Sequence, residues 1–265
     1  MKNQSALVAM LLACLCFCPP AVVWAGEIAV AAASDLTYAF EQAARRFRQQ
    51  TGSSMRPIYG SSGNFFSQIK NGAPYDLFFS ADVEYPKRLE MAGLAEPGSL
   101  YEYAAGRIVL WVPANSRLDA GRGLALLLDP AVRKIAIANP EHAPYGRAAL
   151  AALRHEGIYD RVKDKLVLGE SISQAAQFVA SGNADAGLIA LSLALAPAMK
   201  ARGRYFEINS TNYPPIIQAA VILKAARDKQ TARQFVDFLK QPEGLALMRR
   251  YGFAPPQAGS GGGGN

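Results

Sequence analysis

The chain has 265 residues, of which 51% are hydrophobic, and its 28 basic and 21 acidic residues give a net charge of +7. A chain of this length can bury a substantial core, either as one large domain or as two smaller ones. The basic residues are scattered and form no long run, which argues against a nucleic-acid-binding surface and leaves a mild preference for anionic solutes.

The N-terminal segment has the pattern of a secretory signal peptide. Lys2 precedes an apolar run at residues 6–17, and small residues around Ala25 suit a cleavage site. The apolar run is too short to form a permanent transmembrane helix. We therefore expect residues 1–25 to be a signal peptide that exports the protein to the periplasm. A lipoprotein processing site ending at Cys14 is the less favoured alternative.

The cysteines and histidines argue against thiol or metal chemistry. Cys14, Cys16 and Cys18 all lie inside the predicted leader, so the mature chain has no thiol for a disulfide, a metal site or a nucleophile. His142 and His155 have no acidic or cysteine cluster at ligand spacing around them, so we expect no metal ion held by protein ligands.

Short apolar strands alternate with helices along the chain. The same order of strand, polar turn and helix recurs several times, which indicates an α/β protein with mainly parallel sheets. Strands are predicted at residues 27–33, 55–59, 76–80, 107–113, 135–138, 186–191 and 216–223, and helices at 34–51, 64–70, 81–92, 146–156, 173–181, 232–240 and 243–250.

This order of elements fits two α/β lobes joined by crossing strands better than one long sheet. We place lobe I at residues 26–106 plus 218–257 and lobe II at residues 107–217. Residues 258–265 are mostly glycine and are expected to form a flexible tail.

Four turns that each join a strand to a helix are candidates for a binding site. Open α/β sheets bind ligands at the carboxyl ends of their strands, where helix N-termini present unpaired N–H groups. The turns lie at residues 33–35, 60–63, 143–146 and 170–173, and serine hydroxyls add further donors in the first two. No lysine or arginine lies within them, although Arg147 follows the third turn directly.

The serines in these turns also have a purely structural interpretation. Ser34, Ser61, Ser62 and Ser173 could each cap the helix that follows, since serine is a preferred N-cap. Only the set of four turns favours a binding site. Asp35 complicates an anion site, and we expect its carboxylate to cap its own helix.

The donor set also bears on the ligand. Phosphate at neutral pH keeps a proton and needs an acceptor, whereas molybdate, tungstate and sulfate carry none. A site that offers only donors therefore favours the second group.

Several stretches of the sequence resemble the periplasmic molybdate-binding proteins of ABC importers, and the similarity covers nearly the whole mature chain. The combination of Gly-Ala-Pro-Tyr-Asp at 72–76 with Ser-Ala-Asp at 80–82 is particularly specific. The matching stretches are residues 31–34, 36–37, 59–63, 72–82, 139–146 and 240–253.

The resemblance implies a two-lobed clamshell that binds one molybdate or tungstate ion without catalysis or a cofactor and delivers it to an ABC permease at the inner membrane. By their motif positions, Ser34 and Ser62 match hydroxyl donors of lobe I, and Tyr145 and Ile172 match backbone N–H donors of lobe II. Some members of the family have a tyrosine donor where this chain has Ala190, which leaves a fifth donor open, with the Tyr145 ring or hydroxyl as a partial substitute. We expect a monomer that binds no nucleic acid.

Three other functions are alternatives to molybdate binding. A binding protein for another oxyanion such as sulfate has the same donor requirements. A ferric-ion-binding clamshell would use paired tyrosines, but most of the eleven tyrosines are explained by packing. A serine hydrolase reading rests on the Ser-x-x-Lys spacing of Ser67 and Lys70, which no Lys-Thr-Gly motif follows.

Overall fold

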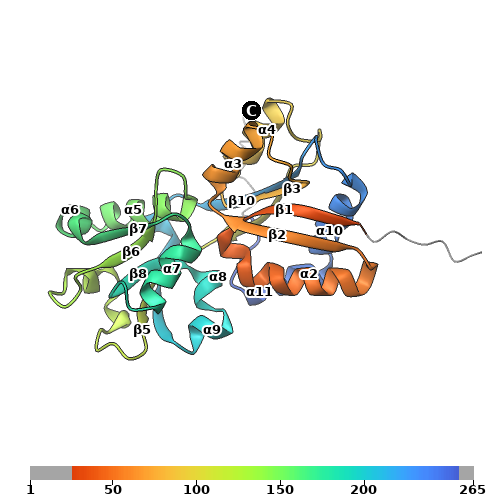
Figure 1. Ribbon diagram of the computed structural model, residues 1–265. Helices are drawn as coiled ribbons and strands as arrows, with labels where there is room; N and C mark the ends of the chain where they lie inside the picture. The colour runs from red at the N-terminus through yellow and green to blue at the C-terminus, as the bar shows by residue number, and fades with distance from the viewer. Residues whose placement is uncertain (1–25, 257–265) are drawn as a thin grey trace, which may run out of the picture.

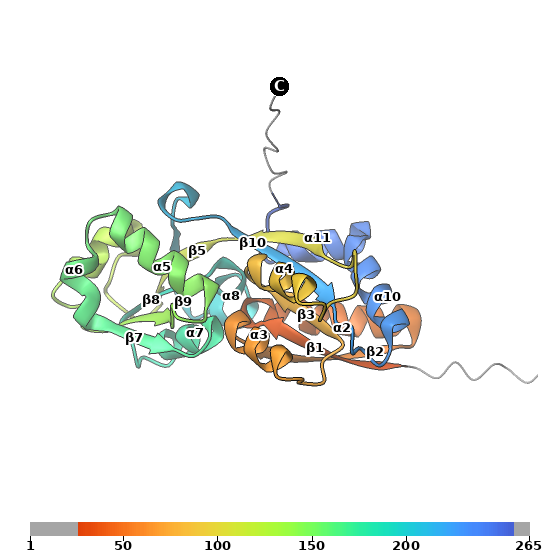
Figure 2. The same ribbon diagram turned by 90° about the horizontal axis from the view of Figure 1, so that it is seen from above.

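The computed structural model describes residues 26–256, which form two five-stranded sheets, each flanked by helices (Figures 1 and 2). The predicted two-lobed α/β architecture is confirmed. We call the half built on the first sheet lobe I and the half built on the second sheet lobe II. The signal peptide predicted for residues 1–25 and the tail predicted for residues 258–265 lie outside the described residues.

The sheet of lobe I has the strand order β2-β1-β3-β10-β4. β1 pairs in parallel with β2 and β3, whereas β10 runs antiparallel to its neighbours β3 and β4. Four strands therefore point the same way and β10 runs against them. The strands are β1 (Glu27–Ala33), β2 (Ser54–Gly60), β3 (Leu77–Ser80), β4 (Tyr101–Gly106) and β10 (Ile216–Ile222).

The sheet of lobe II repeats this plan with the order β7-β6-β8-β5-β9. β6 pairs in parallel with β7 and β8, and β5 runs antiparallel to β8 and β9. The strands are β5 (Ile108–Pro113), β6 (Ile135–Ala138), β7 (Leu166–Gly169), β8 (Ala186–Ala190) and β9 (Gly203–Glu207).

Helices cover both faces of the sheet in lobe I, because successive side chains of a strand point to opposite faces. Val30 and Ala32 pack with Phe40 and Phe235 on one face, and Ala31 packs on the other face in a separate cluster. The α-helices are α2 (Thr37–Thr51), α3 (Ser62–Lys70), α4 (Glu84–Met91), α5 (Pro144–His155), α6 (Tyr159–Val162), α7 (Ile172–Ala180), α8 (Leu191–Ala194), α9 (Pro197–Lys200), α10 (Lys229–Lys240) and α11 (Pro242–Arg250), and the 3₁₀ helices are η2 (Ser34–Leu36), η3 (Ala120–Leu128), η4 (Lys163–Lys165) and η5 (Ser210–Asn212).

Two adjacent segments join the lobes. The chain leaves lobe I between the end of β4 at Gly106 and the start of β5 at Ile108, and it returns through β10 at Ile216. Gly106 and Ile216 are paired in the sheet, so the two segments lie side by side, as Figure 2 shows. The limits predicted for the lobes, 26–106 with 218–257 and 107–217, stay a prediction.

Three strands, β4, β7 and β9, were not predicted. β9 is an edge strand whose residues are mostly exposed, so it has no apolar pattern to mark it. β7 has only four residues, and its side chains are mostly half-buried or exposed. Between residues 26 and 256, no helix has the length and apolar character to span a membrane.

Candidate functional site

The four predicted turns meet at one small cavity between the lobes, which we call the central cavity. The space in it that a water-sized group can reach is only about 10 Å³, roughly what one water molecule needs. The four turns thus lie close together around it, and the site has room only for a very small ligand. It is lined by Ala33, Ser34, Asp35, Gly60, Ser61, Ser62, Ala81, Ala143, Pro144, Tyr145 and Ile172.

The sheet topology explains why turns far apart in the sequence converge. β1 and β2 are parallel neighbours with Ala33 beside Gly60, so the turns that follow them lie at the same edge of lobe I. β6 and β7 are parallel neighbours in lobe II, with Ala138 beside Gly169, and the turns leading into α5 and α7 follow them. Both sheets thus turn the carboxyl ends of their parallel strands toward the cavity.

Ser34 and Ser62 each have an unused hydroxyl hydrogen. Both side chains are buried, with 1% of their surface exposed. Ser34 Oγ accepts a hydrogen bond from the Ser173 N–H at 3.2 Å, and Ser62 Oγ accepts one from the Ala81 N–H at 2.9 Å. Neither hydroxyl donates to an acceptor within residues 26–256, so each can donate into the cavity.

The capping interpretation is wrong for three of the four serines and right for the fourth. Ser61 is the N-cap of α3, and its Oγ accepts from the Asn64 N–H at 3.3 Å. Ser34 makes no cap hydrogen bond, Ser62 bonds outside its helix, and α7 is capped by Ser171 instead of Ser173.

Tyr145 and Ile172 bring unpaired backbone donors to the cavity. Tyr145 is the second residue of α5 and Ile172 is the first residue of α7. The first N–H groups of a helix have no partner within it. Across residues 26–256, these two N–H groups also form no hydrogen bond outside their helices. Helix N-termini of this kind are ready-made anion sites.

Asp35 lies in the first turn of η2, where the backbone N–H groups of Asp35 and Leu36 lower the pKa of its carboxyl, but among the described residues the hydrogen bonds of this carboxyl go to other elements, and the expected cap is not formed. Its Oδ2 accepts hydrogen bonds from the Tyr145 hydroxyl at 2.8 Å and from Gln218 Nε2 at 2.7 Å. The capping hydrogen bond is thus replaced by bonds to α5 and β10. Burial raises the pKa of the Asp35 carboxyl to about 6, although the hydrogen bonds from Gln218 and Tyr145 oppose this shift.

Ala190 brings no hydroxyl to the central cavity. Ala190 is fully buried at the end of β8 and is absent from the cavity lining. Ser192, two residues later, donates its hydroxyl to the Asp35 carbonyl oxygen at 2.8 Å. The Tyr145 hydroxyl, which we expected as a partial substitute, donates to Asp35.

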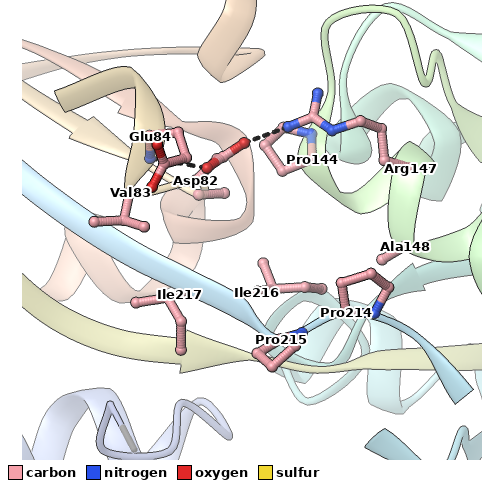
Figure 3. A pocket seen from close by; sticks show the side chains of 11 residues that line it. Asp82, Val83, Glu84, Pro144, Arg147, Ala148, Pro214, Pro215, Ile216 and Ile217 are labelled. Atoms are coloured by element: carbon pink, nitrogen blue, oxygen red, sulfur yellow. Dashed lines mark hydrogen bonds and ion pairs between the residues drawn. The ribbon is translucent and has the colours of Figure 1, made fainter. Parts of the chain in front are cut away.

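The cation nearest to the four turns is already paired. Arg147 on α5 reaches across the lobes to Asp82, with 2.5 Å between Arg147 Nη2 and Asp82 Oδ2 (Figure 3). Its guanidinium also lies 5.8 Å from the centre of the Tyr85 ring. Arg147 and Asp82 line a second pocket, which shares Ala81 and Pro144 with the lining of the central cavity. Among the described residues that line the central cavity, Asp35 is the one with an acidic or basic side chain.

Sequence reasoning missed the contacts that cross between the lobes. The Ser173 N–H bonds to Ser34, Arg147 pairs with Asp82, and Gln218 donates to Tyr145 as well as to Asp35. The sequence does contain a hint that Gln218 has a buried polar partner, because it is a polar residue inside the otherwise apolar strand β10. Among the residues that the structure describes, no group of three His, Cys, Asp or Glu is placed to hold a metal ion.

Comparison with known proteins supports the two-lobed fold and a solute-binding role. The family described as bacterial extracellular solute-binding protein matches residues 28–254. The chain is 39% identical over 229 residues to the molybdate-binding protein ModA of Rhodobacter capsulatus, which covers 86% of this chain and 88% of that protein. It is 39% identical over 248 residues to ModA of Azotobacter vinelandii, covering 94% and 95% of the two chains.

A solved structure agrees with these relationships. The periplasmic molybdate-binding protein of Azotobacter vinelandii aligns with a TM-score of 0.81 at 38% identity, over 87% of this chain and 100% of that one. The clamshell fold expected from the sequence is thereby confirmed.

Proposed function

The chain belongs to the bacterial extracellular solute-binding protein family, and we propose that it captures molybdate in the periplasm for an ABC importer. The observation that carries this proposal is the convergence of four unpaired donors from two lobes on one small cavity. The relatives described above from Rhodobacter capsulatus and Azotobacter vinelandii are molybdate-binding proteins, which supports the same ligand.

The proposed donors are the hydroxyls of Ser34 and Ser62 and the backbone N–H groups of Tyr145 and Ile172. Ser62 and Ile172 begin α3 and α7, and Tyr145 is the second residue of α5, so helix N-termini add partial positive charge around the anion. Neutral donors suit an anion that carries no proton of its own. Tungstate has the same charge and shape as molybdate, and we expect it to bind as well.

We propose binding without catalysis and without a cofactor. A serine nucleophile needs a neighbouring base that accepts its proton. In the part of the chain that the structure describes, the hydroxyls of Ser34 and Ser62 accept from backbone N–H groups and meet no such base. The remaining expectations are a monomer, no nucleic-acid partner, and a permease that receives the anion from the closed protein.

Calorimetric titration of the mature protein with molybdate, tungstate, sulfate and phosphate tests the proposed ligand. We expect at least about a hundredfold preference for molybdate and tungstate, which corresponds to about 2.7 kcal/mol. Sulfate or phosphate binding that equals molybdate binding would contradict the assignment.

Alanine substitutions of the two serines test the proposed donors. We expect Ser34→Ala and Ser62→Ala each to weaken molybdate binding by roughly 1.5–3 kcal/mol, because each removes a hydrogen bond to a buried charge. Ser67→Ala changes an exposed serine of the same helix as Ser62 and should leave the affinity unchanged. Equal affinities for all three variants and the parent would place the anion elsewhere.

Gly63 offers a test of closure. Its N–H donates to the His142 carbonyl oxygen of lobe II at 2.9 Å, and a Cβ at this position would lie 2.7 Å from that oxygen and 2.9 Å from His142 Cα. We expect Gly63→Ala to hold the lobes apart and to weaken molybdate binding. Small-angle scattering should show that molybdate shrinks the parent more than this variant.

The matched control is Asn64→Ala, the next and exposed position of the same helix, which should close like the parent. If Gly63→Ala binds molybdate and contracts as the parent does, the contact between Gly63 and His142 is not part of the bound arrangement.

A further inference from the structure

Asp35 places a buried carboxyl group in a cavity that we propose binds an anion. Its side chain is 1% exposed, and it lines the cavity directly after the proposed donor Ser34. Within residues 26–256, Oδ2 accepts two hydrogen bonds, whereas Oδ1 is buried and has no partner. No salt bridge of the described residues includes Asp35. If the Asp35 carboxylate were ionised, no cation would balance its negative charge, and that charge would lie next to a bound dianion.

The groups around Asp35 do not supply a positive charge. Tyr145 on α5 and Gln218 on β10 contact Oδ2, and Tyr103 on β4 joins the network by donating to Gln218 Oε1 at 2.7 Å. Burial, together with the nearby carboxylate, raises the pKa values of Tyr145 and Tyr103 well above 10, so both stay neutral. Ser192 on α8 contacts only the Asp35 carbonyl oxygen.

The basic side chains that flank the turn at residues 143–146 already have partners. Arg147 pairs with Asp82, and the His142 ring lies 3.1 Å from the Glu170 carboxylate. A proton on Asp35 itself is therefore the simplest way to neutralise the carboxylate. A protonated carboxyl would also turn the partnerless Oδ1 into a hydrogen-bond donor, while Oδ2 keeps both of its present bonds.

We propose that Asp35 couples closure of the lobes to uptake of one proton, with Oδ2 holding Tyr145 of lobe II and Oδ1 carrying the proton when an oxyanion fills the cavity. The inference rests on the proposed function. It makes Asp35 a positioning residue of the site, since it acts on lobe II through the Tyr145 hydroxyl.

The direction of the pH effect follows from linkage. With the lobes in contact and no anion bound, burial raises the pKa of the Asp35 carboxyl to about 6, and a neighbouring dianion raises this pKa further. In the open protein the carboxyl is less buried, so its pKa lies lower. Above pH 6 binding must take up the proton, and the affinity should fall by up to about tenfold per pH unit.

The test is calorimetric titration of molybdate between pH 6.5 and 8.5, in pairs of buffers with different ionisation enthalpies. We expect uptake approaching one proton per anion in the parent. Asp35→Asn should take up none, and its affinity should not depend on pH. At pH 8 this variant should bind about tenfold or more tightly than the parent, because it has no charge to neutralise.

His142→Gln is the control, because histidines as a class gain protons in this pH range. We expect this variant to keep the proton uptake and the slope of the parent. A parent that binds molybdate without proton uptake would overturn the inference and leave the proposed function standing, as would a slope that persists in Asp35→Asn. A parent that binds no molybdate at any pH would overturn the proposed function.

Discussion

The proposed site depends on one constraint: a dianion enclosed in protein must exchange its hydration shell for hydrogen-bond donors that surround it. One sheet edge can supply donors on one side only. The donors of Ser34 and Ser62 lie on lobe I and those of Tyr145 and Ile172 on lobe II, so only both lobes together enclose the central cavity. The two-lobed fold, the parallel strands that end at the cavity and the helices that start there all serve this requirement.

The contacts between the lobes are consistent with a site whose donors come from both lobes. Ser34 accepts the Ser173 N–H, so a proposed anion donor also fixes the position of α7. Arg147 joins the lobes through Asp82 beside the cavity, which keeps its positive charge out of the anion's immediate surroundings.

The sequence predicted the fold and the positions of the turns well, because both follow from local patterns. The strands at 27–33 and 135–138 lie where the apolar runs placed them, and all four turns line the same cavity. The partners of Asp35 could not be predicted. Tyr145 and Gln218 are separated from Asp35 by 110 and 183 residues, and no local pattern reports on such contacts. A helix cap was the reasonable local expectation for Asp35, and tertiary structure overrode it.

The most direct test of the central claim is a crystal structure of the protein with tungstate, in which anomalous scattering locates the tungsten atom. We expect one tungstate in the central cavity, with its oxygens about 2.6–3.2 Å from Ser34 Oγ, Ser62 Oγ and the backbone nitrogens of Tyr145 and Ile172. A tungsten atom outside this cavity, or one whose oxygens contact a single lobe, would contradict this claim.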